Sequence, residues 1–123
     1  MKKLILLLSF SILLSASNTK KPIFYFFHSE FCPHCVQAEP FIESLEKKYP
    51  EIKFEKLEIS SNSNNLTLFK EKVKAFKIDA AGVPFFVFGK SHVMGYRKET
   101  HDKKIISMIE KELPLKVLKS PPK

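Results

Sequence analysis

The chain has 123 residues, enough for one domain with a single modest core but not for several domains. Its 21 Lys and Arg outnumber its 13 Asp and Glu, giving a formal net charge of +8. The basic residues are scattered, with no arginine-rich run or aromatic platform beside them, so we expect no nucleic-acid partner. Only two cysteines are present, which excludes a scaffold held together by several disulfides.

The first residues have the pattern of an export signal. Two lysines precede an apolar run at residues 4–14, and small residues follow at 15–17. This order is typical of a secretory signal peptide, and the apolar run is short for a membrane span. We therefore expect residues 1–17 to be a signal peptide, cut after Ala16 or Ser17, and the protein to reach the periplasm or another extracytoplasmic site. An uncleaved anchor and a buried helix stay open as alternatives.

Both cysteines lie in one Cys-x-x-Cys motif, Cys32 to Cys35. The apolar run at residues 23–28 predicts a strand buried on both faces. A helix is predicted after it, with Pro33 in the first turn and Pro40 producing a kink rather than an end. The apolar positions of this helix are Val36, Ala38, Phe41, Ile42, Leu45 and Tyr49.

A strand that leads into a helix at Cys-x-x-Cys indicates redox chemistry. Cys32 would lie at the helix N-terminus, where unpaired N–H groups and the helix dipole stabilise a thiolate, and Cys35 about one turn further, facing inward. The pair could then close and reopen a disulfide. Three alternatives remain: a structural disulfide, half of a metal site with His28 or His34, and two unrelated free thiols.

The remaining elements follow from hydrophobic periodicity and turn residues. In chain order they are a strand at 52–59, a polar turn at 60–65, a helix over 66–76, a break at 80–82, a strand at 83–88 that begins with proline, a short hairpin connection at 89–91, a strand at 92–96, and a helix from Glu99 or Thr100 to Leu113. The predicted fold is therefore α/β with the order β-α-β-α-β-β-α. A crossover helix makes the first two strands parallel, and the closing hairpin is antiparallel. We expect a four-stranded mixed sheet with helices on both faces, spanning residues 18–114 and followed by a flexible tail at 115–123.

In this order, five features resemble the thioredoxin-fold thiol-disulfide oxidoreductases. They are residues 29–35 as the active-site loop with Phe31 before the first cysteine, Pro40 in the helix, residues 56–59 at the end of the next strand, residues 82–84 as the segment whose cis-proline faces the cysteines, and Gly95 in the last strand. The dipeptide Pro33-His34 is similar to that of DsbA-like disulfide oxidases.

The resemblance implies an enzyme that exchanges a Cys32–Cys35 disulfide with protein thiols. It implies that Cys32 is the nucleophile and Cys35 the resolving thiol, that Pro33 and His34 tune the redox equilibrium, and that Phe31, Val83 and Pro84 bind the substrate. No cofactor or metal is implied. The partners would be protein thiol or disulfide substrates and a membrane-bound or soluble recycling protein, and we expect a monomer.

The sequence departs from the family pattern at two places. Phe26 occupies the first-strand position at which members often bury a carboxylate. We therefore expect the lysine that usually accompanies it, here Lys56, only to extend its ammonium group to solvent. Only 48 residues separate Cys35 from Pro84, which leaves room for one strand and one helix. A helical insertion of the DsbA-like kind is therefore not expected.

The direction of electron transfer is the last expectation. His34 and the helix N-terminus would stabilise the Cys32 thiolate, and Phe26 removes a negative charge that would oppose it, so oxidation of substrates is favoured. A pairing of Lys56 with Glu30 or Glu58 could instead give the Cys32–Cys35 pair the lower reduction potential of a reductase. The alternatives are thus an exported thioredoxin-like reductase and a metal-binding or metal-delivery module built from Cys32, Cys35 and a histidine.

Overall fold

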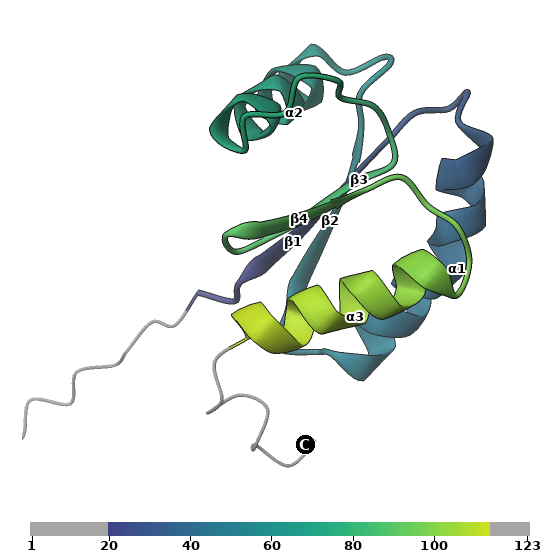
Figure 1. Ribbon diagram of the computed structural model, residues 1–123, viewed down its shortest axis with the longest axis vertical. Helices are drawn as coiled ribbons and strands as arrows, with labels where there is room; N and C mark the ends of the chain where they lie inside the picture. The colour runs from purple at the N-terminus through teal and green to yellow at the C-terminus, as the bar shows by residue number, and fades with distance from the viewer. Residues whose placement is uncertain (1–19, 114–123) are drawn as a thin grey trace, which may run out of the picture.

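The computed structural model describes residues 20–113, so the predicted signal peptide and tail lie outside the described residues. The elements are β1 Ile23–His28, α1 Pro33–Lys48, β2 Lys53–Glu58, α2 Ser63–Ala75, β3 Phe85–Phe88, β4 Ser91–Met94 and α3 Thr100–Glu112 (Figure 1). Their order confirms the predicted β-α-β-α-β-β-α arrangement. In this part of the chain, none of the helices has both the length and the apolar character needed to cross a bilayer.

The four strands form one mixed sheet in the order β2-β1-β3-β4. β1 and β2 are parallel, with Ile23 opposite Lys53, and β3 is antiparallel to β1 and to β4. Because parallel strands end at the same edge of a sheet, the loops after β1 and β2 lie at one end of the molecule. We call this the redox end, because it holds Cys32.

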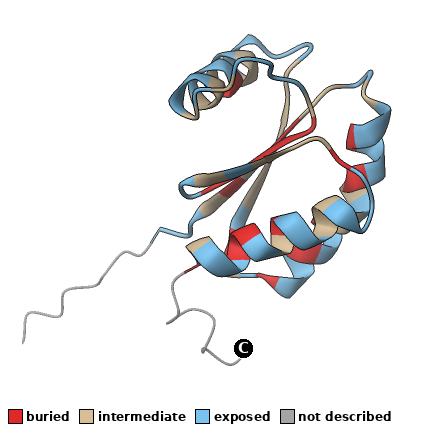
Figure 2. Cartoon of the chain, viewed as in Figure 1, coloured by how far each residue is buried: buried red, intermediate tan, exposed pale blue. Residues whose placement is uncertain are grey.

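Side chains of β1 alternate between two cores, as the period of two in a strand requires. Phe24 and Phe26 face α1 and α3, and Phe27 faces α2 on the other side of the sheet (Figure 1). All three are at most 1% exposed, and each buried ring contributes about 1.5–3 kcal/mol to folding. Figure 2 shows buried residues on the strands and on the helix faces turned toward them. Ile23, Tyr25 and His28 are only partly buried, so β1 is less completely enclosed than predicted.

Helix α1 starts with proline and continues through Pro40, as predicted. Its buried positions are Cys35, Ala38, Ile42 and Leu45, which share one face at helical spacing. Val36 was predicted to belong to this apolar set but is 59% exposed. It follows the buried Cys35 by one residue, about 100° around the helix, so it points away from the core.

The largest differences from the predicted boundaries are in α2, β3 and β4, and the other boundaries differ by at most one residue. α2 begins at Ser63, inside the predicted turn, because the Asn62 side chain caps it by accepting the Asn65 N–H at 3.0 Å. β3 begins at Phe85, after the cis Val83–Pro84 peptide, rather than at residue 83. β4 is shifted and ends at Met94, because Gly95 has φ +83° and leaves the strand geometry.

Candidate redox site

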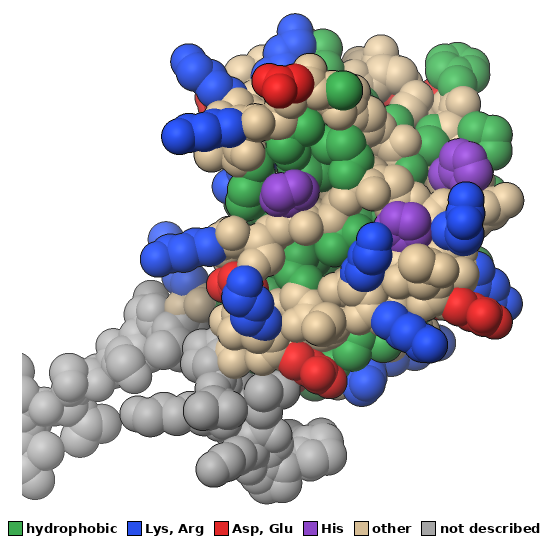
Figure 3. Space-filling model, viewed as in Figure 1, with side chains coloured by type: hydrophobic (Ala, Val, Ile, Leu, Met, Phe, Trp, Pro, Cys, Tyr) green, Lys and Arg blue, Asp and Glu red, His purple; other side chains and the backbone are tan. Residues whose placement is uncertain are grey.

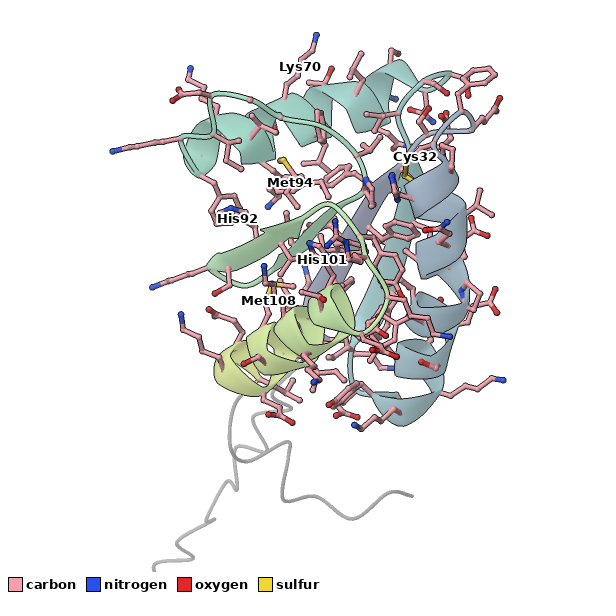
Figure 4. The ribbon with its side chains drawn as sticks, turned by 45° about the vertical axis from the view of Figure 1, so that its right-hand side comes forward. Cys32, Lys70, His92, Met94, His101 and Met108 are labelled. Atoms are coloured by element: carbon pink, nitrogen blue, oxygen red, sulfur yellow. A yellow bond between two sulfur atoms is a disulfide. The ribbon has the colours of Figure 1, made fainter. Side chains whose placement is uncertain are left out.

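Cys32 is the N-cap residue of α1, with φ −111° and ψ 101°. Its sulfur accepts a hydrogen bond from the Cys35 N–H at 3.1 Å. Its carbonyl accepts from the N–H groups of Cys35 and Val36 at 3.1 and 3.2 Å. Figure 4 places Cys32 at the first turn of α1. The sulfur therefore lies where the free N–H groups and positive end of the helix dipole stabilise negative charge.

The two cysteines form a disulfide, with Cα atoms 5.2 Å apart, but their surroundings differ. Cys35 is 1% exposed and belongs to the core between the sheet, α1 and α3, whereas Cys32 is only partly buried at the edge of that core. A reagent or protein thiol approaching from solvent therefore meets the Cys32 sulfur first. This asymmetry agrees with the inward-facing Cys35 predicted from the sequence.

The loop before α1 turns a large apolar side chain outward. Ser29 accepts the Phe31 N–H on its hydroxyl at 3.3 Å and the Cys32 N–H on its carbonyl at 3.2 Å. Phe31 is 84% exposed, and with Val36 it makes up the exposed large apolar side chains found within residues 20–113. Both are adjacent in sequence to a cysteine of the disulfide. Sequence reasoning singled out Phe31 but missed Val36, although the position of Val36 next to an inward-facing Cys35 could have revealed it.

The segment before β3 lies against the disulfide. The Val83 carbonyl oxygen is 3.6 Å from the Cys32 sulfur, although Val83 comes 51 positions later in the sequence. The Val83–Pro84 peptide is cis, as the resemblance implied, and Pro84 is buried. The Pro84 carbonyl accepts the Gly95 N–H at 2.8 Å, which fixes this segment to the end of β4. Val83 thus presents its backbone at the edge of the candidate site.

Phe26 fills the core behind the cysteines without a carboxylate. It is 1% exposed and stacks on Phe86, with ring centroids 5.1 Å apart. Lys56, opposite Phe26 in the sheet register, forms an ion pair with Glu46 at 3.0 Å. The suggested pairing of Lys56 with Glu30 or Glu58 is therefore wrong. Glu46 is eleven residues along α1 from Cys35, roughly 16 Å by helical rise, so this ion pair is remote from the buried sulfur.

Glu58 instead organises the loop after β2. Its carboxylate accepts the N–H groups of Ser60 and Ser61 at 2.7 and 2.8 Å, the Ser61 hydroxyl at 2.6 Å, and the Ser60 hydroxyl. Hydrogen bonds from the Ser60 hydroxyl and then the Ser61 hydroxyl lower the pKa of Glu58 to about 2. The Glu58 carboxylate therefore fixes the loop after β2, and the hydrogen bonds from Ser60 and Ser61 stabilise its negative charge.

The histidines occupy four different settings. His34 is exposed in the first turn of α1, and the His28 ring lies 5.2 Å from that of Phe26. His92 packs on Phe76 with centroids 4.5 Å apart, and His101 Nδ1 accepts the Arg97 N–H at 2.8 Å, both away from Cys32 (Figure 4). Among residues 20–113, no three His, Cys, Asp or Glu side chains come close enough together to hold a metal ion.

A family model described as Thioredoxin matches residues 9–111. The chain belongs to the thioredoxin family. It is similar to thioredoxin f from spinach chloroplast in its short form, with 25% identity, a TM-score of 0.59 and coverage of 76% of this chain and 78% of that one. Thioredoxin f2 of Chlamydomonas reinhardtii is 20% identical, with a TM-score of 0.55 and coverage of 80% and 84%. Fasciola hepatica thioredoxin is 24% identical, with a TM-score of 0.54 and coverage of 75% and 81%. No curated protein matches the sequence.

Family membership and the Cys32–Cys35 disulfide together establish the activity class. This thioredoxin-family chain is a thiol-disulfide oxidoreductase, and proteins of its fold act on protein thiols and disulfides. The predicted thioredoxin-like sheet with flanking helices is confirmed.

Proposed function

We propose that the protein is an exported disulfide oxidase, DsbA-like in its active-site dipeptide, that passes the Cys32–Cys35 disulfide to protein thiols. The observation that carries this proposal is the hydrogen bond from the Cys35 N–H to the Cys32 sulfur at the helix N-cap. The same donor favours a Cys32 thiolate once the disulfide opens, because an anion accepts it more strongly than a neutral sulfur. Stabilising the reduced form makes the disulfide more oxidising.

The exchange proceeds in two displacements. A client thiolate attacks the Cys32 sulfur, the Cys32–Cys35 bond breaks, and Cys35 leaves as a thiolate that takes up a proton. A second client thiolate then attacks the client sulfur of the mixed disulfide, and Cys32 leaves as a thiolate. The client loses two electrons and gains a disulfide, while the protein gains two electrons as a dithiol. A recycling partner, membrane-bound or soluble, must then accept these two electrons.

His34 and Phe26 support the oxidase direction. His34 is in the first turn of α1, where an imidazole that donates or carries a proton favours a nearby thiolate. Phe26 replaces a carboxylate behind the disulfide, and the Lys56–Glu46 ion pair lies outside this region. No negative charge from these groups then opposes the thiolate, so the dithiol form is favoured.

Phe31, Val83 and Pro84 are proposed to hold the client. An extended client chain would lie along the Val83 backbone in the strand-addition mode, with the cis Pro84 shaping that surface. An apolar client side chain would cover Phe31, which is 84% exposed. Val36, which follows Cys35 in the sequence, is a second exposed apolar side chain next to a cysteine of the disulfide. Pro33 completes the motif at the first helical position, where it needs no hydrogen-bond acceptor.

A thioredoxin-like reductase is the second candidate, favoured by the 25% identity to thioredoxin f. The same two displacements then run backwards: Cys32 attacks a client disulfide and Cys35 resolves the mixed disulfide. The metal-binding alternative from the sequence would need a histidine brought to the cysteine pair in the reduced protein.

Cysteine variants test the exchange chemistry. Cys32→Ser should reduce thiol oxidation and insulin reduction to below roughly 1% of the wild-type rate, because the buried Cys35 cannot be attacked from solvent. Cys35→Ser should instead accumulate mixed disulfides through Cys32, visible on non-reducing gels. Mixed disulfides in Cys32→Ser, or faster alkylation of Cys35 than of Cys32 in the reduced protein, would reverse the assignment.

Zinc titration of the reduced protein is the parallel assay, and tight binding with no exchange activity would favour the metal module.

A further inference from the structure

Basic residues gather at the end of the fold opposite Cys32. This end is made by the chain before β1, the α1–β2 connection, the β3–β4 turn and the last turn of α3 (Figure 1). The lysines there are Lys20, Lys21, Lys47, Lys48, Lys53, Lys90 and Lys111, and we call this surface the basic pole. The acids in these segments and in the last turn of α1 are Glu46, Glu51, Glu110 and Glu112.

Hydrogen bonds hold neighbouring segments of the basic pole together. The Lys53 N–H donates to the Pro22 carbonyl at 2.9 Å, and the Lys21 ammonium donates to the Pro50 carbonyl at 3.1 Å. The hairpin is held to α3 because the Ser91 hydroxyl donates to Glu112 at 2.6 Å. The lysines of the basic pole therefore act together on whatever approaches it.

Glu46, Glu55 and Glu112 are already engaged by partners, whereas Glu51 and Glu110 have no ion pair within residues 20–113. Glu112 accepts hydrogen bonds from the Ser91 hydroxyl and the Lys90 N–H, which lower its pKa. Glu55 pairs with Lys53 at 2.9 Å, and this bond raises the pKa of Lys53. The remaining six lysines of the basic pole are exposed and have no ion pair within residues 20–113, so most of the positive charge faces solvent.

A hollow opens within the basic pole. Its volume is about 460 Å³, and Lys20, Lys21, Ile23 and Lys53 line it. Of the three lysines that line it, Lys53 pairs with Glu55 and Lys21 donates to the Pro50 carbonyl, whereas Lys20 has no ion pair within residues 20–113. Such lysines suit a phosphate-bearing headgroup, because a lysine is a mobile point charge with three donors. Ile23 adds an apolar wall.

The two ends of the described chain lie at this pole. Residue 20 is two residues before β1, and Leu113 follows Glu112 (Figure 1). The apolar run at residues 4–14 ends six residues before Lys20, a separation of roughly 20 Å at full extension. Any surface that holds this apolar run is therefore within reach of the basic pole and on the side away from Cys32.

The redox end has a different charge balance. Its loops carry Glu30, Glu58 and Glu99 against Arg97 and Lys98. In the view of Figure 3, apolar side chains occupy the corner where the loop before α1 lies, and Lys and Arg side chains are spread over the face, including the edge near the grey chain ends. The basic pole thus carries more net positive charge than the loops of the redox end.

We propose that the basic pole docks on an anionic phospholipid surface and holds the Cys32–Cys35 pair facing away from it. Each lysine near such a surface contributes about 1 kcal/mol, and the attraction decays over a Debye length of about 8 Å at 0.15 M salt. Where the apolar run at residues 4–14 stays as an uncleaved anchor, the pole and the run would act as two membrane signals at one end of the protein, and after cleavage the pole would act alone. Cys32 then stays open to clients and to a recycling partner.

Vesicle binding of the full chain tests this orientation. Lysine acetylation read by mass spectrometry should show protection of Lys20, Lys47 and Lys90 on phosphatidylglycerol vesicles, but not on phosphatidylcholine vesicles. Lys98, Lys103 and Lys104 should stay equally reactive on both. Equal protection of the two sets, or none on anionic vesicles, would overturn the proposal.

Two triple variants that each remove three lysine charges test whether vesicle binding depends on where the charges lie or only on the net charge. Changing Lys20, Lys47 and Lys90 to Gln should weaken binding to anionic vesicles by roughly 100-fold, at about tenfold per 1.4 kcal/mol. The same change at Lys98, Lys103 and Lys104 should weaken it by less than about threefold. Equal losses would mean a general charge effect and refute the docking surface. Competition by 10 mM inorganic phosphate that abolishes binding would identify a free-anion site instead. Insulin reduction by both variants checks that they are folded.

Discussion

Cys32 and Cys35 are separated by two residues but have opposite surroundings. Cys32 caps a helix and accepts an N–H at 3.1 Å, whereas Cys35 is buried in the main core. The N-cap position supplies donors for an anion, and burial among apolar groups disfavours one. The positions of the two cysteines in α1 therefore give them different roles: Cys32 is the sulfur that exchanges with the client, and Cys35 is the sulfur that resolves the mixed disulfide.

Glu58 provides a test of charge and stability at the same scale. Its pKa is lowered to about 2 by hydrogen bonds from Ser60 and Ser61, so its carboxylate stabilises the fold at pH values above the unfolded pKa of about 4.5. That stabilisation is lost as the pH falls from about 4.5 toward 2. We expect Glu58→Gln to lower the urea midpoint at pH 7 and to have no effect near pH 2.

Glu51→Gln, a carboxylate with no hydrogen bond or ion pair among residues 20–113, is the control for the loss of one negative charge. It should leave the urea midpoint nearly unchanged at both pH values. A Glu58→Gln deficit that is as large at pH 2 as at pH 7 would contradict the hydrogen-bonded carboxylate.

At the scale of elements, the β3–β4 hairpin depends on one glycine. Gly89 has φ +59°, a conformation that costs other residues about 1–2 kcal/mol. A Cβ at this position would come within 2.5 Å of the Glu112 carboxylate, which holds the Ser91 hydroxyl. Gly89→Ala should therefore lower the free energy of unfolding by about 1–3 kcal/mol, measured by urea denaturation.

Gly82→Ala is the matched control, since a Cβ there meets no atom within 4 Å and its φ is not in the left-handed range. Its free energy of unfolding should stay within about 0.5 kcal/mol of the wild type. Equal free energies of unfolding for the two variants would mean that position 89 does not require glycine and that the nearby Glu112 carboxylate does not restrict the side chain there.

The sequence predicted the order and type of every element because their hydrophobic periods are clear. It also predicted Cys32 at the N-terminus of the helix, since Cys-x-x-Cys follows a strand directly. It misplaced the start of α2, because the cap depends on the Asn62 side chain accepting the Asn65 N–H. The Lys56–Glu46 pair was also missed, because it depends on how α1 is rotated against the sheet. The exposure of Val36 was missed although its place one residue after the inward-facing Cys35 indicates it.

At the scale of the whole molecule, the strands run between two ends that carry different functional groups. Loops after β1 and β2, and the segment before β3, bring Cys32, Phe31 and Val83 together at the redox end. The opposite ends of the same strands and helices form the basic pole. One fold thus supplies an exposed disulfide at one end and positive charge at the other.

The reduction potential of the Cys32–Cys35 pair, titrated against glutathione, tests the proposed oxidase most directly. We expect a value on the oxidising side of the about −270 mV of thioredoxin. His34→Ala should lower it by roughly 20–30 mV, because about 1.4 kcal/mol of thiolate stabilisation corresponds to 30 mV. A wild-type potential at or below about −270 mV that is unchanged in His34→Ala would contradict the oxidase assignment and support the reductase.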